Sequence, residues 1–130
     1  MNFTIIDYMA HIDGHIIDTA PYKLSLIDYE EIQNGDYLKT PKSYTRVCKE
    51  IISHNKLNIK GRRSELVDKR SFIYDLLVNK GKNTTTYTAF LFGQDHSNIL
   101  HHLKRVKYLK KDREYIENTR QFNNFFINYL

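Results

Sequence analysis

The chain has 130 residues, of which 41% are hydrophobic and 27% charged, with a net charge of +5 and one cysteine, Cys48. This length suits one domain with its own core, and a single cysteine excludes an internal disulfide. No secretory signal segment and no apolar run of about 18 residues occurs. We therefore expect a reducing, cytoplasmic setting without membrane association, and we expect Cys48 to be a small buried residue rather than a reactive thiol.

The charge is divided unevenly along the chain. Residues 1–40 hold seven Asp and Glu against two Lys, a net charge of -5, so residues 41–130 carry +10. Basic charge concentrated in one part of a chain is typical of proteins that bind polyanions. We predict an acidic N-terminal segment, 1–40, followed by a basic domain, 41–130.

The acidic segment contains two local signals. The dipeptide Asp13-Gly14 lies between β-branched and aromatic residues, a pattern that suits a small β-hairpin. Ser25 with Asp28 three residues later resembles a capping box, and Gly35 can end the short helix that follows. Thr40-Pro41 interrupts the chain where the composition turns basic.

The remainder predicts a mainly α fold, a helical bundle. Apolar spacing indicates one helix from Ser43 to Asn55, and a second that Ser64 caps and that ends near Asn79. Its apolar stripe is Leu66, Ile73, Leu76 and Leu77. The last segment, with Tyr115, Phe122, Phe126 and Tyr129, predicts a final amphipathic helix that packs back on the domain.

Between these helices, the sequence has the layout of a helix-turn-helix. Thr84 to Thr86 open a helix of about two turns with Tyr87, Phe90 and Leu91 at i, i+3 and i+4, and Gly93 ends it. Asp95 suits the N-cap of the next helix, whose Ile99, Leu100, Leu103 and Val106 form a face that we expect to be buried.

The opposite face of this second helix carries the chemistry of a DNA-reading surface. Ser97 and Asn98 offer short donors and acceptors for base edges near the helix start, while Lys104 and Arg105 offer cations for phosphates farther along. Ser97, Asn98, His101, Lys104, Arg105 and Tyr108 share this arc.

Residues 92–101 read FGQDHSNILH. This run resembles the signature of the C-terminal DNA-binding domain of the bacterial replication initiator DnaA. That signature reads, position by position, Phe-Gly, then Arg or Lys, then Asp-His, a small residue, Thr, Val, then Leu or Ile, and finally His. The resemblance extends from Thr40 to the C-terminus and includes the basic run KGRRSELVDKR at 60–70. It implies a helix-turn-helix that binds double-stranded DNA.

The resemblance also implies roles for individual residues. Asp95, His96 and Ser97 match residues that contact base edges in the major groove, and Gln94 and Asn98 flank them. Gln94 stands where the family has Arg or Lys, Asn98 replaces a Thr, and Ser97 lacks the methyl group of Thr, so we expect a target that differs from the DnaA box. From the helix pattern alone, His96 lies on the apolar arc, where a packing or capping histidine is the alternative interpretation.

The basic loop, Lys60, Arg62 and Arg63, matches a loop that places an arginine in the adjacent minor groove. With His101, Lys104 and Arg105, it completes the expected minor-groove and phosphate contacts. We expect double-stranded DNA as the partner, in the nucleoid of a bacterial cell, bound by a monomer or a homodimer.

No feature of the sequence suggests an enzyme, a metal site or a cofactor. These residues contain no GxxxxGK loop with a following Ser or Thr, the phosphate-binding motif of an ATPase. His11 and His15 have helical metal spacing without a third ligand nearby, and His101 and His102 point in different directions on one helix. We therefore expect a regulator or decoy in replication or transcription, encoded by a phage or other mobile element.

The alternative hypothesis concerns the acidic segment. Residues 1–40 could form a protein-interaction module or inhibitor that binds a basic partner or covers the DNA-binding face. The simpler interpretation of the same residues is a solvated cap that completes the core.

Overall fold

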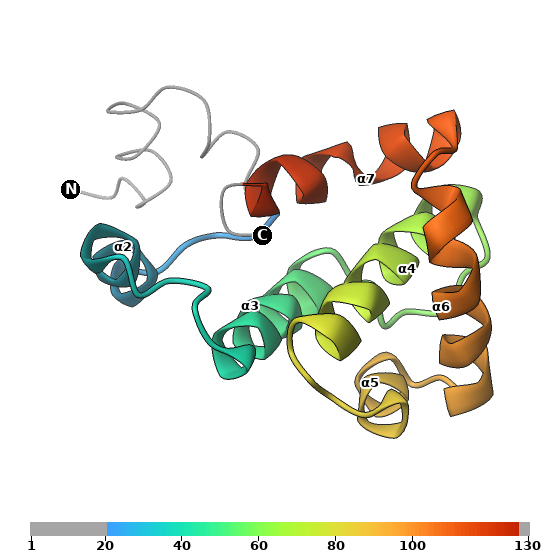
Figure 1. Cartoon of the computed structure of the whole chain (residues 1–130), viewed down its shortest axis with the longest axis horizontal. Helices are drawn as coiled ribbons and strands as arrows, with labels where there is room; N and C mark the ends of the chain where they lie inside the picture. The colour runs from blue at the N-terminus through green and yellow to red at the C-terminus, as the bar shows by residue number, and fades with distance from the viewer. Residues whose placement is uncertain (1–20, 128–130) are drawn as a thin grey trace.

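The computed structural model describes residues 21–127, which form six α-helices and no β-strand (Figure 1). The predicted mainly α fold is confirmed. The predicted hairpin at Asp13-Gly14, the His11–His15 pair and Tyr129 lie outside the described residues. The helices are α2 (Leu26–Asn34), α3 (Pro41–His54), α4 (Ser64–Asn79), α5 (Thr85–Phe92), α6 (His96–Leu109) and α7 (Arg113–Phe126).

Helix α4 is the centre of the fold. Helices α3, α5, α6 and α7 all pack against it, as Figure 1 shows. Ile73 and Leu77 of α4 and Val47 and Ile51 of α3 are completely buried in the core between these helices. Cys48 of α3 is a free cysteine in the same core, and burial raises the pKa of its thiol, so the prediction of a small buried residue is confirmed.

The described part of the acidic segment belongs to the domain core. Four of its side chains are buried in the main hydrophobic cluster: Tyr22, Leu24, Tyr37 and Leu38. The rings of Tyr22 and Tyr37 pack edge-on against Phe125 of α7, with ring centroids 5.8 and 6.4 Å away. Residues 21–40 are therefore an integral layer of the fold.

Helix α2 is fixed at both ends as the sequence predicts. The Ser25 hydroxyl accepts a hydrogen bond from the Asp28 N–H while the Asp28 carboxylate accepts from the Ser25 N–H, so the capping box is complete. Gly35 ends the helix with φ of 76°. The Arg46 guanidinium of α3 then holds Asp28 and Glu31 of α2 together, the second at 2.7 Å.

Two helix starts differ from the sequence-based prediction. Helix α3 begins at Pro41 rather than Ser43, because the Thr40 hydroxyl accepts from the Ser43 N–H and proline suits the first helical position. Ser64 does not cap α4: Arg63 is the N-cap residue, without a side-chain capping bond. The Ser64 hydroxyl instead donates to Glu114 of α7, at 2.7 Å.

Two predicted apolar faces are also only partly correct. Helix α5 buries Thr88, Ala89 and Phe92, while Phe90 is 76% exposed. The apolar residues of α5 are spread around all sides of this eight-residue helix, so their pattern does not indicate which face is buried. Contact with α4 and α6 determines the buried face. On α6, Ile99 and Val106 are buried as predicted, but Leu100 at the edge of the stripe is 42% exposed.

Helix α7 confirms its predicted amphipathic pattern. Its buried side chains include Tyr115, Phe122 and Phe126, and the Phe72 ring of α4 packs against the last two. None of the helices in residues 21–127 is long and apolar enough to cross a membrane.

Removal of residues 1–40 tests the structural role of the acidic segment. We expect the truncated chain to be largely unfolded, because four buried side chains at about 1.5–3 kcal/mol each amount to much of the roughly 5–15 kcal/mol that stabilises a domain. Circular dichroism during thermal unfolding measures this. A truncated chain that melts as cooperatively as the full chain, and binds DNA more tightly, would instead support an inhibitory role for this segment.

Candidate nucleic-acid interface

The turn between α5 and α6 sets the angle of the second helix. Gly93 adopts the left-handed conformation, with φ of 64°, and its N–H donates to the last carbonyls of α5. The Gln94 N–H donates to the Ala89 carbonyl at 2.9 Å, which completes the helix end. A residue with a Cβ is strained at this φ, so the turn favours glycine. The predicted layout, two helices joined by a glycine-bearing turn, is present, with α5 packed against α6.

The first turn of α6 presents three exposed polar side chains, Asp95, His96 and Ser97. The Asp95 carboxylate caps the helix by accepting from the Ser97 N–H, and this hydrogen bond lowers the pKa of Asp95. His96 Nδ1 lies 3.2 Å from Asp95 Oδ1, and the His96 side chain is 58% exposed. His96 is therefore not a packing histidine: its ring is exposed to solvent and lies against the N-cap carboxylate.

The two flanking residues contact one another. Asn98 Nδ2 donates to Gln94 Oε1 at 3.1 Å, and both side chains are half-buried. This bond uses the Asn98 amide nitrogen and the Gln94 amide oxygen, so the Gln94 amide nitrogen and the Asn98 amide oxygen are the groups that the pair can offer to a ligand. The five predicted base-reading residues thus divide into three fully presented side chains and one hydrogen-bonded pair.

The predicted phosphate contacts lie farther along the same helix. His101, Lys104 and Arg105 are all exposed. Neither Lys104 nor Arg105 forms an ion pair within residues 21–127, so both cations are available for an external anion. The exposed ring of Tyr108 and the Lys107 ammonium above it, 5.2 Å from the ring centroid, extend this surface toward the helix end.

The basic loop faces the turn of the helix-turn-helix. Lys60 and Arg62 line one side of a groove of about 790 Å³, and Gly93, Gln94 and Asn98 line the other. Residues about 30 positions apart in the sequence therefore share one surface. Arg63 follows Arg62 in the sequence and is exposed at the start of α4, but it does not line the groove.

A buried arginine that we did not predict as a site residue holds this loop in place. Arg70 is 6% exposed, and its guanidinium donates to three loop carbonyls, those of Leu57 and Gly61 at 2.7 Å each and that of Ile59. The sequence contains the signal, because Arg70 interrupts the apolar stripe of α4 between Leu66 and Ile73. A cation on an apolar face requires buried acceptors, and here they are loop carbonyls.

The Arg70→Met variant tests this role. Loss of the guanidinium leaves three carbonyls without their donor, so we expect the free energy of unfolding to fall by at least about 2 kcal/mol. Amide hydrogen exchange should accelerate in residues 57–61 more than in α3. The matched control is Lys69→Met, which removes a neighbouring cation that pairs only with Glu65, at the surface. Equal effects of the two substitutions would show that Arg70 does not fix the loop.

The two adjacent histidines of α6 have different environments. His101 is exposed, whereas His102 is half-buried next to the Tyr74 ring and the Ser71 hydroxyl, and burial lowers the pKa of His102. In the described residues, no group of three or more His, Cys, Asp or Glu side chains is placed to hold a metal ion.

Comparisons of this chain with protein-family models, with curated proteins and with solved structures gave no match.

Proposed function

We propose that this chain binds double-stranded DNA, with the first turn of α6 in the major groove and the basic loop on the adjacent backbone and minor groove. One observation carries the proposal: Lys60 and Arg62 of the loop and Gln94 and Asn98 of the helix-turn-helix line the same groove. A reading helix beside a separate basic element is the arrangement by which several helix-turn-helix proteins contact two grooves.

The chemistry of the presented side chains suits base edges. Ser97 can donate to or accept from a base, and His96 can do the same with its ring nitrogens. The Asp95 carboxylate, exposed and held ionised by its capping bond, can accept from the amino group of cytosine. All three groups lie at the N-terminal end of α6, the end that the proposed pose places in the major groove.

The distribution of charge supports the same pose. The acidic helix α2 and the recognition helix α6 lie at opposite ends of the molecule in Figure 1. Asp28 and Glu31 of α2 are already paired with Arg46, which makes them poor mimics of phosphate for the basic face. Lys104 and Arg105, without ion pairs in the described chain, remain for DNA phosphates.

The resemblance of residues 92–101 to the DnaA signature supports this docking and suggests a biological role. A domain that occupies a DNA site can block or recruit other proteins there, so we propose a regulator or decoy in replication or transcription. The family differences at Gln94, Ser97 and Asn98 indicate a target that departs from the DnaA box.

Selection from a random duplex library at physiological salt tests the proposal directly. We expect one enriched motif, bound with strong salt dependence. No enriched duplex together with no salt-sensitive binding would overturn the proposal.

The Ser97→Ala variant tests base reading. Loss of the hydroxyl should weaken binding to the selected duplex by about 1–3 kcal/mol and leave binding to random duplex unchanged, because the proposed contact is to a base edge and not to a phosphate. Fluorescence anisotropy with both duplexes measures the ratio of affinities. Ser53→Ala, which changes an exposed serine of α3, is the control and should leave both affinities unchanged. An unchanged ratio for Ser97→Ala would place this residue outside the base contacts.

The Lys104→Ala variant tests phosphate contact. Binding should weaken for selected and random duplexes alike, and the slope of log affinity against log salt should decrease by about one unit, because one fewer counterion is released. Lys39→Ala, on the acidic part of the chain, should leave the slope unchanged. A change in sequence preference without a change in slope would assign Lys104 to base reading instead.

A further inference from the structure

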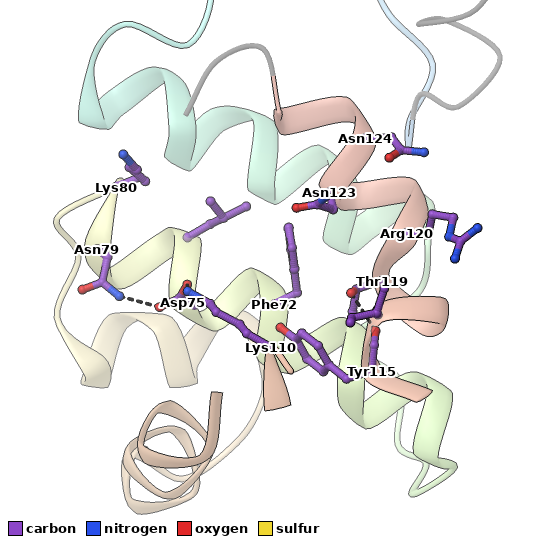
Figure 2. A pocket seen from close by; sticks show the side chains of 12 residues that line it. Phe72, Asp75, Asn79, Lys80, Lys110, Tyr115, Thr119, Arg120, Asn123 and Asn124 are labelled. Atoms are coloured by element: carbon purple, nitrogen blue, oxygen red, sulfur yellow. Dashed lines mark hydrogen bonds and ion pairs between the residues drawn. The ribbon is translucent and has the colours of Figure 1, made fainter. Parts of the chain in front are cut away.

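A second hollow, of about 900 Å³, opens between α4 and α7 and is distinct from the proposed DNA surface (Figure 2). Phe72 and Asp75 are on its α4 wall, Tyr115 and Ile116 are on its α7 wall, and Lys110 closes one end. Lys110 is the C-cap of α6, so about 20 Å of helix separates it from the reading end. The DNA contacts proposed above use none of these residues.

Tyr115 has a buried polar group without a partner. Its side chain is 3% exposed, and its hydroxyl forms no hydrogen bond within the described chain. Burial raises the pKa of this hydroxyl, so it stays protonated and can donate. A buried hydroxyl without a partner destabilises the folded state, and a phenylalanine here would avoid this cost. The hydroxyl therefore points to a ligand that accepts its hydrogen bond.

The groups around Tyr115 define the chemistry of that ligand. Figure 2 shows Tyr115, Lys110 and Asp75 at the same end of the hollow, with Lys110 Nζ 3.4 Å from Asp75 Oδ2. Three cations line the hollow: Lys80, Lys110 and Arg120. Lys110 is paired with Asp75 and Arg120 with Glu117, whereas Lys80 has no ion pair in the described residues, so the surroundings of the hollow keep a net positive charge that favours an anion.

The apolar part of the lining indicates the chemistry of the uncharged part of the ligand. Phe72 and Ile116 face the hollow from opposite walls, and Ile116 is 45% exposed. Ligand sites in proteins typically combine such apolar walls with a few convergent polar groups and enclose about 300–1,000 Å³. The dimensions here suit a molecule with one or two rings.

We propose that this hollow binds a small organic anion, a carboxylate or phosphate monoester on a flat apolar body. The anionic group accepts from the Tyr115 hydroxyl and lies against the Lys110 ammonium, while the ring system lies between Phe72 and Ile116. The site is independent of the proposed DNA surface.

Titration of the full chain followed by ¹H–¹⁵N NMR tests this site. The probes are indole-3-acetate as the carboxylate, phenyl phosphate as the phosphate monoester, and indole-3-acetamide as the neutral analogue of the first. We expect saturable shifts at residues that line the hollow with at least one anion, and at least tenfold weaker binding of the amide. The stronger of the two anions identifies the class of natural ligand.

Two variants and one control separate binding from folding. Lys110→Met should weaken anion binding about tenfold, and Lys111→Met, the exposed neighbour that does not line the hollow, should leave it unchanged. Tyr115→Phe should weaken binding several-fold while raising the midpoint of thermal unfolding of the ligand-free chain, because the unpaired hydroxyl is removed.

Four results would each overturn the proposal. The first is that neither anion causes saturable shifts at the hollow, and the second is that the acid and its amide bind with equal affinity. The third is that Lys110→Met and Lys111→Met have equal effects on binding. The fourth is that Tyr115→Phe has a lower unfolding midpoint than the unmodified chain. The last would show that the hydroxyl has a structural partner.

Discussion

The fold depends on the burial of α4 among four other helices. A helix covered on several sides must satisfy every polar side chain it carries, and α4 carries three buried ones. Asp68 accepts from Asn118 of α7 at 2.8 Å, Ser71 donates to the Val67 carbonyl of its own helix, and Arg70 donates to the loop before the helix. The Asp68 bond therefore holds α7 against α4, and the Arg70 bond holds the preceding loop against it.

Arg70 connects this packing to the candidate interface. Its hydrogen bonds to the loop carbonyls hold residues 57–61 against the helix, and the exposed Lys60 and Arg62 are carried by that loop. The position of two surface cations thus follows from one buried cation. In the proposed complex with DNA, a loop fixed in this way would lose less entropy than a free one, which would favour affinity and a defined register.

The position of the acidic segment in the fold has a structural cause that its composition does not reveal. Arg46 draws Asp28 and Glu31 onto α3, and Tyr22 and Tyr37 extend the core over Phe125. The acidic charge of residues 21–40 is consequently held at the end of the molecule remote from α6. Within the described residues, this places the carboxylates of α2 away from Lys104 and Arg105 of α6.

The local signals of the sequence predicted the helices well, because each depends on neighbours within one turn. The capping residues Ser25, Thr84 and Asp95 and the terminating glycines Gly35 and Gly93 lie where the chemistry of helix ends places them. The same signals predicted the polar first turn of α6 and the basic loop as candidate DNA contacts. Their presence on one surface is a tertiary property.

Properties that depend on distant residues were missed or misjudged. Phe90 is exposed because α4 and α6 select the opposite face of a helix that is apolar all round, and no periodicity within eight residues can indicate that choice. Ser64 bonds Glu114 instead of capping α4, since α7 brings a carboxylate within 2.7 Å. The role of Arg70 depends on the loop carbonyls that pack over it. The Tyr115 hydroxyl lacks a partner, and the hollow beside it exists, only because of how α4 and α7 pack together.

By itself, then, the sequence determined the helices, most of their ends and the chemical character of the α6 surface, which are set by interactions over a few residues. Tertiary structure alone decided which cation is buried, which loop faces the helix-turn-helix, and which hydroxyl lacks a partner. Those outcomes depend on desolvation, and a side chain is desolvated only when segments far apart in the chain pack over it.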